Sequence, residues 1–322
     1  MLAAFAARVD ADDPLSALEV GEQPDPTAPD GWAVVTVKAA SLNHHDVWAL
    51  RGVALSADQT PMILGGDAAG IDEDGNEVVV HSVIGDPDAG GGDETYDPRR
   101  SLLSERHPGT FAEKVAVPRR NLLPKPPELS WEEAACLPTA WLTAYKMLFS
   151  RSGARPGDTV LVQGAGGGVA TAAIVLARAG GFRVWATSRS EDKRKAALAV
   201  GAHEVFEAGA RLPGKVDAVI DSVGEATLDH SIKSARPGGR VVLCGATSGG
   251  VAQVVLARVY FTQVDVLGST MGNRRELQEL LNLLVTTGAR PIIDSVFPLE
   301  QARDALAKMV GGNFFGKVVL TP

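Results

Sequence analysis

The sequence predicts an α/β protein in which a doubly wound, six-stranded parallel sheet follows a separate β-rich region. From Thr159 onward, short apolar runs rich in β-branched residues alternate with helical stretches, which is typical of βαβ units in a parallel sheet. Within the first ~120 residues, short apolar runs are instead divided by turn residues, with a single short helical stretch. The length of 322 residues fits two domains better than one.

The composition is that of an ordinary globular protein, with 45 % hydrophobic and 22 % charged residues. The formal net charge of −8 argues against a general nucleic-acid binder, which needs a basic face. The longest apolar stretch, Val169–Ala177, is far shorter than the ~20 residues of a membrane-spanning helix. The first nine residues lack the basic and apolar segments of a signal peptide. We therefore expect a cytoplasmic protein with no nucleic-acid or membrane partner.

The first region is expected to contain a series of short strands with one helix. Asp74-Gly75-Asn76 predicts a tight turn between two of the strands. The helix is expected over His44–Leu50, with Gly52 just past its end. The expected strands are Leu2–Ala7, Trp32–Ala40, Ile63–Ile71, Glu77–Val83 and Phe111–Val117.

The segment Asp86–Gly109 interrupts this pattern. It holds three consecutive glycines, Gly90 to Gly92, followed by acidic and then basic residues. Because a structureless loop of this length is uncommon inside a domain, we interpret it as a surface lobe.

The second region is expected to supply the parallel sheet. Its six strands are Thr159–Gln163, Arg183–Thr187, Glu204–Phe206, Val216–Asp221, Arg240–Cys244 and Val264–Gly268. Its helices are Val169–Ala179, Glu191–Val200 and Ala226–Ala235, the last ended by Pro237-Gly238-Gly239, and a further amphipathic helix covers Glu276–Val285. The C-terminal ~30 residues are expected to form strand, helix and strand and to pack on the first region.

The strongest chemical signal is the run Gly164-Ala165-Gly166-Gly167-Gly168-Val169-Ala170, which follows an apolar strand and opens an apolar helix. Glycines permit the tight turn and let the backbone approach a pyrophosphate at the positive end of the helix. Ala170 stands where a third glycine is common and still allows close packing of helix on strand. In this context the run predicts a dinucleotide site, although a plain glycine-rich turn is the alternative.

The tip of the second strand indicates which dinucleotide binds. An NAD site offers an acidic residue to the ribose 2′-hydroxyl about 20 residues after the glycines. Here Ser188 and Arg189 occupy the tip, and Lys193 follows one turn later. A hydroxyl and two cations suit a 2′-phosphate, so we expect NADPH. The alternative is that Ser188 or Ser190 only caps the following helix, with Glu191 completing a capping box.

Further motifs accompany the glycine run along the chain. They are Ala39-Ala40-Ser41-Leu42-Asn43 with Asp46 and Gly52, Gly65-Gly66-Asp67-Ala68-Ala69-Gly70, Gly109-Thr110-Phe111-Ala112-Glu113, Leu142-Thr143-Ala144-Tyr145, Asp221-Ser222-Val223-Gly224 and Gly316-Lys317-Val318-Val319-Leu320. With these motifs the chain resembles the medium-chain dehydrogenase/reductase family over nearly its whole length. The resemblance implies a Rossmann domain at residues 141–271 and a β-rich, GroES-like catalytic domain at residues 1–140 and 272–322.

Alcohol dehydrogenases of this family bind a catalytic zinc through positions that correspond to Asn43, Gly66 and a residue near Thr139. None of these residues is a usual zinc ligand, since zinc takes thiolate, imidazole or carboxylate. The Asp86–Gly109 lobe also lacks the four cysteines of the family's structural zinc. A replacement site built on His44 and His45 is disfavoured, because adjacent residues on a helix diverge by about 100°. The chain is therefore similar to the zinc-free quinone oxidoreductase branch, and no bound metal is expected.

The resemblance also implies the residues of the site. The catalytic candidates are Asn43, which could donate to the developing oxyanion or only position the nicotinamide ribose, and His44. Trp48 is expected to wall the site, although an ordinary core aromatic is equally compatible with the sequence. The expected cofactor-binding residues are Trp48, Thr143, Gly166, Gly167, Gly168, Val169, Ser188, Arg189, Lys193, Gly245, Ala246, Thr247 and Lys317.

The function predicted from these features is NADPH-dependent hydride transfer, without zinc, to a quinone or to the β-carbon of an α,β-unsaturated carbonyl such as an enal. A homodimer is expected, as is usual in the family. We also expect the cleft between the two domains to hold the substrate. The alternative is an NADPH-binding protein with little or no turnover, of a crystallin-like or regulatory kind. Turnover of NADPH with a quinone would distinguish the two.

Overall fold

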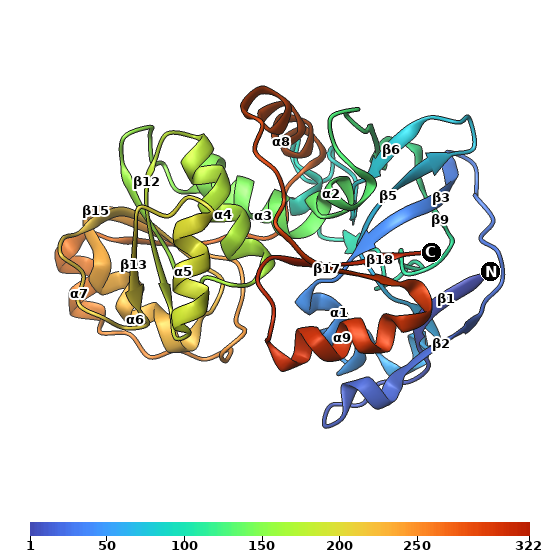
Figure 1. The fold of residues 1–322 in the computed structure, drawn as a ribbon, viewed down its shortest axis with the longest axis horizontal. Coiled ribbons are helices and arrows are strands. Elements are labelled where there is room, and N and C mark those ends of the chain that lie inside the picture. The colour runs from blue at the N-terminus through green and yellow to red at the C-terminus, as the bar shows by residue number, and fades with distance from the viewer. The chain divides into compact units, whose positions relative to one another are not determined.

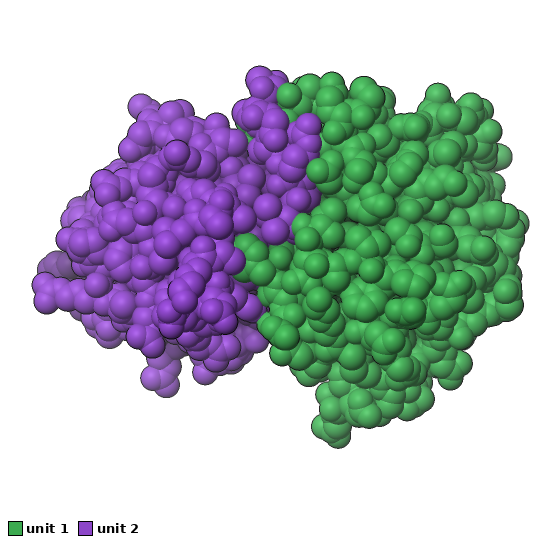
Figure 2. All heavy atoms as spheres, viewed as in Figure 1, with its two compact units in different colours: residues 1–139, 273–285, 293–322 green, residues 140–272, 286–292 purple.

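The computed structural model describes residues 1–322, and the chain divides into two compact units (Figure 2). Unit 1 comprises residues 1–139, 273–285 and 293–322. Unit 2 comprises residues 140–272 and 286–292. No helix is long and apolar enough to cross a membrane.

Unit 2 contains the predicted six-stranded parallel sheet, of which β12, β13 and β15 are labelled in Figure 1. The strand order is β13-β12-β11-β14-β15-β16. Every pair of neighbouring strands is parallel, and the strand order reverses beside β11, so that β12 and β14 flank it. The doubly wound fold class is thereby confirmed. The strands are β11 (Thr159–Val162), β12 (Arg183–Ser188), β13 (Glu204–Glu207), β14 (Val216–Asp221), β15 (Ala235–Leu243) and β16 (Asp265–Gly268).

Helices cover this sheet because its inner strands carry buried apolar side chains. Leu161, Val219 and Val241, from three neighbouring strands, are fully buried in one cluster. The helix α4 (Gly168–Ala179) buries seven of its residues, and it contacts β11, β12 and β14. The other helices of unit 2 are α3 (Leu142–Tyr145), the π-helical segment Lys146–Arg151, α5 (Glu191–Ala199), α6 (Glu225–Ser234) and α7 (Leu256–Thr262).

One strand of the sheet starts earlier than expected. Pro237-Gly238-Gly239 was predicted to separate a helix from a strand that begins at Arg240, but β15 begins at Ala235 and includes all three residues. A register shift in its pairing with β14 accommodates them, between the partners of Val216 and Ala218. Gly238 has a φ of +68°, which glycine adopts without steric cost.

Unit 1 is built on a mainly antiparallel seven-stranded sheet in the order β10-β6-β5-β3-β18-β17, with β9 also paired to β3. A three-stranded sheet, β2-β1-β4, and a two-stranded sheet, β7-β8, complete it. The strands are β1 (Leu2–Ala6), β2 (Leu18–Glu22), β3 (Trp32–Ser41), β4 (Met62–Ile63), β5 (Asp67–Asp72), β6 (Glu77–Val80), β7 (Val83–Ile84), β8 (Ser101–Leu102), β9 (Lys114–Pro118), β10 (Leu122–Pro124), β17 (Ile293–Pro298) and β18 (Lys317–Thr321).

The single strand predicted over Ile63–Ile71 is wrong, because the chain breaks there into β4 and β5. β4 pairs with β1, whereas β5 pairs with β3 and β6. Gly65 lies at the break with a φ of +95°. Gly109 approaches this bend so closely that a β-carbon on it would lie 2.3 Å from the carbonyl oxygen of Leu64. Gly65 and Gly109 therefore form a corner at which the chain passes from one sheet to another.

The helices of unit 1 include α1 (His44–Leu50), which has the predicted bounds, and the C-terminal strand–helix–strand also forms as predicted. Its last strand, β18, pairs with β3, so the chain end completes the main sheet of the first region. The remaining α-helices are α2 (Trp131–Ala135), α9 (Ala302–Gly311) and α8 (Arg274–Thr287), the last of which begins in unit 1. Short 3-10 helices are η1 (Pro14–Ala17), η2 (Ala57–Gln59), η3 (Glu94–Tyr96), η4 (Arg119–Asn121) and η7 (Leu299–Gln301). A π-helical segment covers Leu137–Trp141.

The Asp86–Gly109 lobe is more ordered than a surface loop. It contains η3 and β8, and Glu94 is buried with its carboxylate 3.0 Å from the ring of His81. The same carboxylate accepts a hydrogen bond of 2.6 Å from the backbone of Arg274 at the start of α8. Although burial acts to raise it, these hydrogen bonds lower the pKa of Glu94 to about 2. The lobe is thus attached to the rest of unit 1 by a buried carboxylate.

Candidate functional site

The glycine loop leaves open space at the start of α4. Gly164 and Gly166 have φ values of +71° and +142°, and Gly167 is the N-cap of the helix. A β-carbon added at Gly167 would meet no atom within 4 Å. The loop therefore presents bare backbone at the positive end of a 12-residue helix, which is the environment that a pyrophosphate needs.

A second loop packs against the first one. A β-carbon at Gly164 would lie 2.5 Å from the side chain of Val223, which follows β14. The buried carboxylate of Asp221 holds this loop, because it accepts hydrogen bonds from the backbone of Val223 (2.9 Å) and Gly224 (3.1 Å) and from the hydroxyl of Thr227 (2.8 Å). Asp221 is therefore a structural residue at the strand end.

The tip of β12 carries the residues predicted to recognise a 2′-phosphate. Ser190 is the N-cap of α5, and its hydroxyl accepts a 3.3 Å hydrogen bond from the backbone of Lys193. Ser188 does not cap the helix, since it is buried at the strand end and its hydroxyl accepts from the backbone of Ser190. Arg189 is exposed beside it. The capping alternative thus applies to Ser190 and leaves Ser188 and Arg189 at the tip.

Lys193 lies directly over the glycine loop. A β-carbon at Gly166 would be 2.6 Å from Cδ of Lys193 and 3.1 Å from its Nζ. A residue that sequence reasoning missed, Arg194, donates a 2.7 Å hydrogen bond to the carbonyl of Ser188 and so fixes the strand tip. Two basic residues on consecutive positions of α5 are therefore directed to the loop and the tip.

The loop after β15 approaches the loop after β14. Thr247 donates a 3.4 Å hydrogen bond to the carbonyl of Ser222, and a β-carbon at Gly224 would lie 2.9 Å from Ala246. Gly245 approaches Ser222 equally closely. The structure thus brings the predicted residues 166–169, 188, 189, 193 and 245–247 to the carboxyl-terminal edge of one sheet. Thr143 is buried on α3, a helix that contacts α4.

In unit 1, the predicted residues cluster at the start of α1. Asn43 is the N-cap, and its backbone N–H donates to the carboxylate of Asp46 at 2.7 Å. His44 is exposed, and its ring centroid lies 6.4 Å from that of Trp48. The surrounding protein partly desolvates the ring, and this effect together with the charge of Lys317 lowers the pKa of His44, so its imidazole is neutral at pH 7.

Below Asn43 lies a buried network of charged and polar groups that the sequence did not reveal. Nζ of Lys317 contacts the carbonyl of Leu42 (2.7 Å), Oδ1 of Asn43 (2.7 Å) and Oδ2 of Asp67 (3.3 Å). The hydroxyl of Ser41 also donates to Oδ2 of Asp67, at 2.8 Å. Lys317 is 2 % exposed and Asp67 is 0 % exposed. Lys317 is therefore an internal counter-charge rather than a residue presented to a ligand.

The same network engages the Asn43 side chain. Its amide nitrogen donates to Oδ2 of Asp67 at 2.8 Å and to the carbonyl of Ser41 at 3.4 Å. Its oxygen accepts from Lys317. Both amide hydrogens and one lone pair are thus used inside unit 1, which orients Asn43 but leaves it no donor for a substrate oxygen.

Asp46 and His45, in the first turn of α1, are both held by polar contacts. Asp46 is fully buried, and burial raises its pKa to about 6 although His45 and the backbone of Asn43 act to lower it. His45 lies 3.1 Å from the carboxylate of Glu105. Asp46 also completes the capping box of Asn43 at the start of α1.

The donor set in unit 1 does not fit a zinc ion. No three His, Cys, Asp or Glu side chains are grouped so that they could hold a metal. Gly66 carries no ligand, and a β-carbon there would lie 2.8 Å from the hydroxyl of Ser82. Asn43 is held by Lys317 and Asp67 instead of facing a cation.

Two family models match the chain. The alcohol dehydrogenase GroES-like domain matches residues 29–127, and the zinc-binding dehydrogenase domain matches residues 168–286. The chain is 31 % identical to the acryloyl-coenzyme A reductase of Metallosphaera sedula, over 94 % of this chain and 96 % of that protein. It is 30 % identical to an alcohol dehydrogenase of Geobacillus stearothermophilus, over 94 % and 96 %. It is 29 % identical to the crotonyl-CoA carboxylase/reductase of Cereibacter sphaeroides, over 92 % and 81 %.

Solved structures of a dehydrogenase and of a reductase also resemble this chain. An NAD-dependent alcohol dehydrogenase superposes with a TM-score of 0.92 at 35 % identity, covering all of both chains. A 2-octenoyl-CoA carboxylase reductase in complex with NADP and 2-octenoyl-CoA superposes with a TM-score of 0.92 at 26 % identity, over 99 % of this chain and 87 % of that one. The chain belongs to the medium-chain dehydrogenase/reductase family, as its motifs predicted. It is an oxidoreductase with a Rossmann domain and a GroES-like domain.

Proposed function

We propose that this protein transfers a hydride from NADPH to the β-carbon of an α,β-unsaturated carbonyl compound, without zinc. The observation that carries the proposal is the strand tip of unit 2, where Ser188, Arg189 and Lys193 stand beside an open glycine loop and no acid takes the ribose. NADPH, when bound, supplies the hydride. The residues of the chain bind it, orient it and stabilise the charge that develops on the substrate.

The basic residues at the strand tip support NADPH as the cofactor. A 2′-phosphate carries nearly two negative charges, which Arg189 and Lys193 can meet with charge-assisted hydrogen bonds. Gly166 and Gly167 let the backbone approach the pyrophosphate at the start of α4. NADP in the related 2-octenoyl-CoA carboxylase reductase supports this choice, whereas the NAD-dependent alcohol dehydrogenase makes NADH the competitor to be tested.

The substrate class rests on the relatives and on the residues of unit 1. Relatives named acryloyl-coenzyme A and crotonyl-CoA reductases support an enoyl thioester or a similar unsaturated carbonyl. Addition of hydride to the β-carbon of such a compound creates an enolate, and a proton then reaches the α-carbon. A quinone is the second acceptor that the sequence predicts, since it also takes hydride and stabilises an oxyanion.

Of the two predicted catalytic residues, His44 is the one able to donate to that oxyanion. Its ring is exposed and neutral, so one nitrogen carries a hydrogen for a substrate oxygen. Asn43 is a positioning residue, because its amide is bound to Asp67 and Lys317. The network around Lys317 thus keeps the start of α1 rigid in a protein that has no zinc ligands there.

We also propose that the protein is a homodimer, joined through the outer edge of the unit 2 sheet. β16 is an edge strand and is paired on one side only, with β15. Exposed apolar side chains gather on β16 and the segment before it: Val251, Val255, Leu256, Tyr260, Phe261 and Val266. A second copy can cover this surface, since a twofold axis lets the two edge strands pair. Light scattering at micromolar concentration should give twice the chain mass of 33.6 kDa, and Phe261→Glu should give a monomer.

A substrate screen tests the proposed reaction. The purified protein should oxidise NADPH in the presence of crotonyl-CoA, an enal or a quinone, and NADH more slowly. His44→Phe should lower kcat with little effect on the KM for NADPH, whereas the surface control Lys195→Gln should change neither. Absence of NADPH oxidation with every acceptor, together with tight binding of NADPH, would favour the binding protein without turnover.

A further inference from the structure

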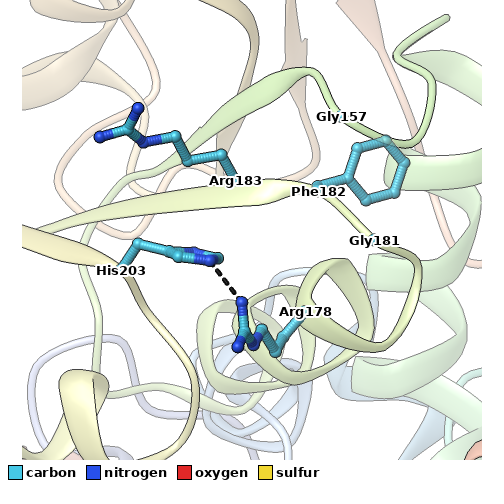
Figure 3. A pocket seen from close by; sticks show the side chains of 6 residues that line it. All are labelled: Gly157, Arg178, Gly181, Phe182, Arg183 and His203. Carbon is cyan, nitrogen blue, oxygen red and sulfur yellow. Dashed lines mark hydrogen bonds between the residues drawn. The ribbon is translucent and has the colours of Figure 1, made fainter.

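A pocket of about 410 Å³ lies at the opposite end of the unit 2 sheet from the glycine loop. It is formed where the chain enters β11, β12 and β13, and by the end of α4, whereas the glycine loop follows the carboxyl end of β11. Figure 3 shows the residues that line it, which are Gly157, Arg178, Gly181, Phe182, Arg183 and His203. The pocket is therefore separate from the loops proposed to hold the cofactor.

The two contacts of the His203 ring require more acceptors than a neutral imidazole has. The backbone N–H of Val184 donates to Nδ1 of His203 at 2.9 Å, so Nδ1 is the acceptor nitrogen of the ring. A neutral imidazole has only one acceptor, and Nε2 must therefore carry the hydrogen. Nε2 nevertheless faces Nη1 of Arg178, as the dashed line in Figure 3 shows, and a guanidinium can only donate. Two donors meet with no acceptor between them.

The charges around the pocket keep this arrangement in place. Burial, Arg178 and Arg183 lower the pKa of His203, and Glu204 only partly offsets them. The contacts of Glu204 are to other residues, since its Oε1 accepts from the guanidinium of Arg183 at 2.6 Å and from the indole nitrogen of Trp185 at 3.1 Å. His203 is accordingly neutral at pH 7, with its Nε2–H directed to the pocket side of the ring.

Two features of the pocket walls prepare it for a ligand. The aliphatic part of Arg178 packs on Gly201, where a β-carbon would lie 3.1 Å from its Cγ, and this fixes the direction of the guanidinium. Gly157 and Gly181 have φ values of +97° and +80°, and neither puts a side chain into the space. The backbone N–H groups of these two glycines donate to Gly181 and Arg178, so the free donors are on the side chains.

We propose that this pocket binds an oxyanion of the phosphate class, which accepts hydrogen bonds from both the Arg178 guanidinium and Nε2 of His203. One anion oxygen that accepts from both nitrogens, which move apart to admit it, resolves the mismatch, and its negative charge offsets the excess of arginine. Charge-assisted hydrogen bonds from a guanidinium to a phosphate are among the strongest in proteins. The site does not depend on the proposed hydride transfer.

The test is a titration of the wild-type protein with inorganic phosphate at constant ionic strength and pH 7.5, followed by the imidazole NMR signals. The protein has six histidines, and the His203 signals are those lost in His203→Gln. We expect these signals to shift with a saturable dependence on phosphate. Arg178→Gln should weaken binding by about tenfold or more, the effect of one charge-assisted hydrogen bond. Arg275→Gln, on α8 in unit 1, is the matched control and should bind like the wild type.

A parallel titration with a nucleoside monophosphate separates a free oxyanion from a phosphate carried by a nucleotide. Tighter binding of the nucleotide would support the second source, and equal binding the first. The proposal is overturned if neither probe shifts the His203 signals across the millimolar range, or if Arg178→Gln binds both as well as the wild type. Unchanged signals of the other histidines show that the variants are folded.

Discussion

At the scale of single residues, Lys317 shows how the environment of a side chain decides its role. The resemblance to the family placed this lysine near the cofactor, but its ammonium group is buried against Leu42, Asn43 and Asp67. A buried charge persists only when it is paired and hydrogen-bonded. No sequence pattern could reveal this, because Asp67 and Lys317 are 250 positions apart in the chain.

Removal of this ammonium should destabilise the protein strongly. Lys317→Met leaves the carboxylate of Asp67 buried without its counter-charge, and breaking a buried pair costs about 3–5 kcal/mol. Urea unfolding at pH 7 measures the loss. The double variant Lys317→Met/Asp67→Asn should recover part of it, because the uncompensated charge is gone. A loss below about 1 kcal/mol in the single variant would show that the pair does not stabilise unit 1.

Arg189 should discriminate between the two nicotinamide cofactors. Arg189→Ala removes a charge-assisted hydrogen bond worth about 1.5–3 kcal/mol, so the KM for NADPH should rise about 10–100-fold. The KM for NADH should change little, because NADH has no 2′-phosphate. Steady-state kinetics with both cofactors measure the two constants, with Lys195→Ala on the exposed side of the following helix, α5, as the control. Equal changes for NADPH and NADH would show that Arg189 does not bind the 2′-phosphate.

Asp46 should make stability fall as pH rises. Its pKa is about 6 in the folded protein and 3.8 in the unfolded chain, so between these values the folded state binds more protons. The stabilisation is complete below pH 3.8 and is lost as pH rises through about 6. Asp46→Asn should remove this dependence, so the stability of the variant relative to the wild type should increase by up to about 3 kcal/mol between pH 4 and 7.

Urea unfolding at several pH values between 4 and 7 gives this difference directly. Asp88→Asn, on an exposed carboxylate, is the control and should show no such trend. A difference between Asp46→Asn and wild type that is independent of pH would mean that Asp46 is not protonated in the folded state.

At the scale of elements, local pattern predicted the second region better than the first. The six strands of unit 2 lie close to where alternating apolar and helical segments placed them, because buried parallel strands are continuous apolar runs, and only β15 begins well before its predicted start. β2 in unit 1 was missed, since Leu18–Glu22 has two acidic residues and a glycine, and it becomes a strand by pairing with β1. α7 was also missed; none of its residues is fully buried, and Leu256, Tyr260 and Phe261 are exposed.

At the open start of α4, a substitution should affect the binding of NADPH without affecting the stability of the fold. Gly167→Val should change the free energy of unfolding by no more than about 1 kcal/mol, because its φ is −78° and its β-carbon meets no atom. Affinity for NADPH should nevertheless fall at least tenfold, since the side chain fills the approach to the helix start. Calorimetric titration and urea unfolding measure the two quantities. Gly109→Ala, whose β-carbon would lie 2.3 Å from a carbonyl oxygen, is expected to lower the free energy of unfolding and to leave the affinity for NADPH unchanged.

Variants at these two glycines can contradict the proposed site clearly. Unchanged NADPH affinity in Gly167→Val would mean that the pyrophosphate binds elsewhere. A large loss of stability in the same variant would mean that the space beside Gly167 is filled in solution.

At the scale of the whole molecule, each unit contributes a distinct part of the proposed chemistry. Unit 2 supplies the glycine loop and the basic strand tip, and unit 1 supplies the rigid start of α1 with His44. The family and both domain types could be predicted from the motifs, and the family models match residues 29–127 and 168–286. The buried network could not be predicted, because it depends on contacts between β3, β5 and β18 that only the folded sheet creates.

The most direct test of the proposed reaction follows the hydride itself. The protein is incubated with NADPH that carries deuterium at C4 of the nicotinamide and with crotonyl-CoA or a simple enone, and the product is analysed by NMR and mass spectrometry. We expect one deuterium at the β-carbon of a saturated carbonyl product, and the same result after treatment with a zinc chelator. Deuterium on the carbonyl carbon of an alcohol product, or activity that the chelator abolishes and zinc restores, would contradict the account.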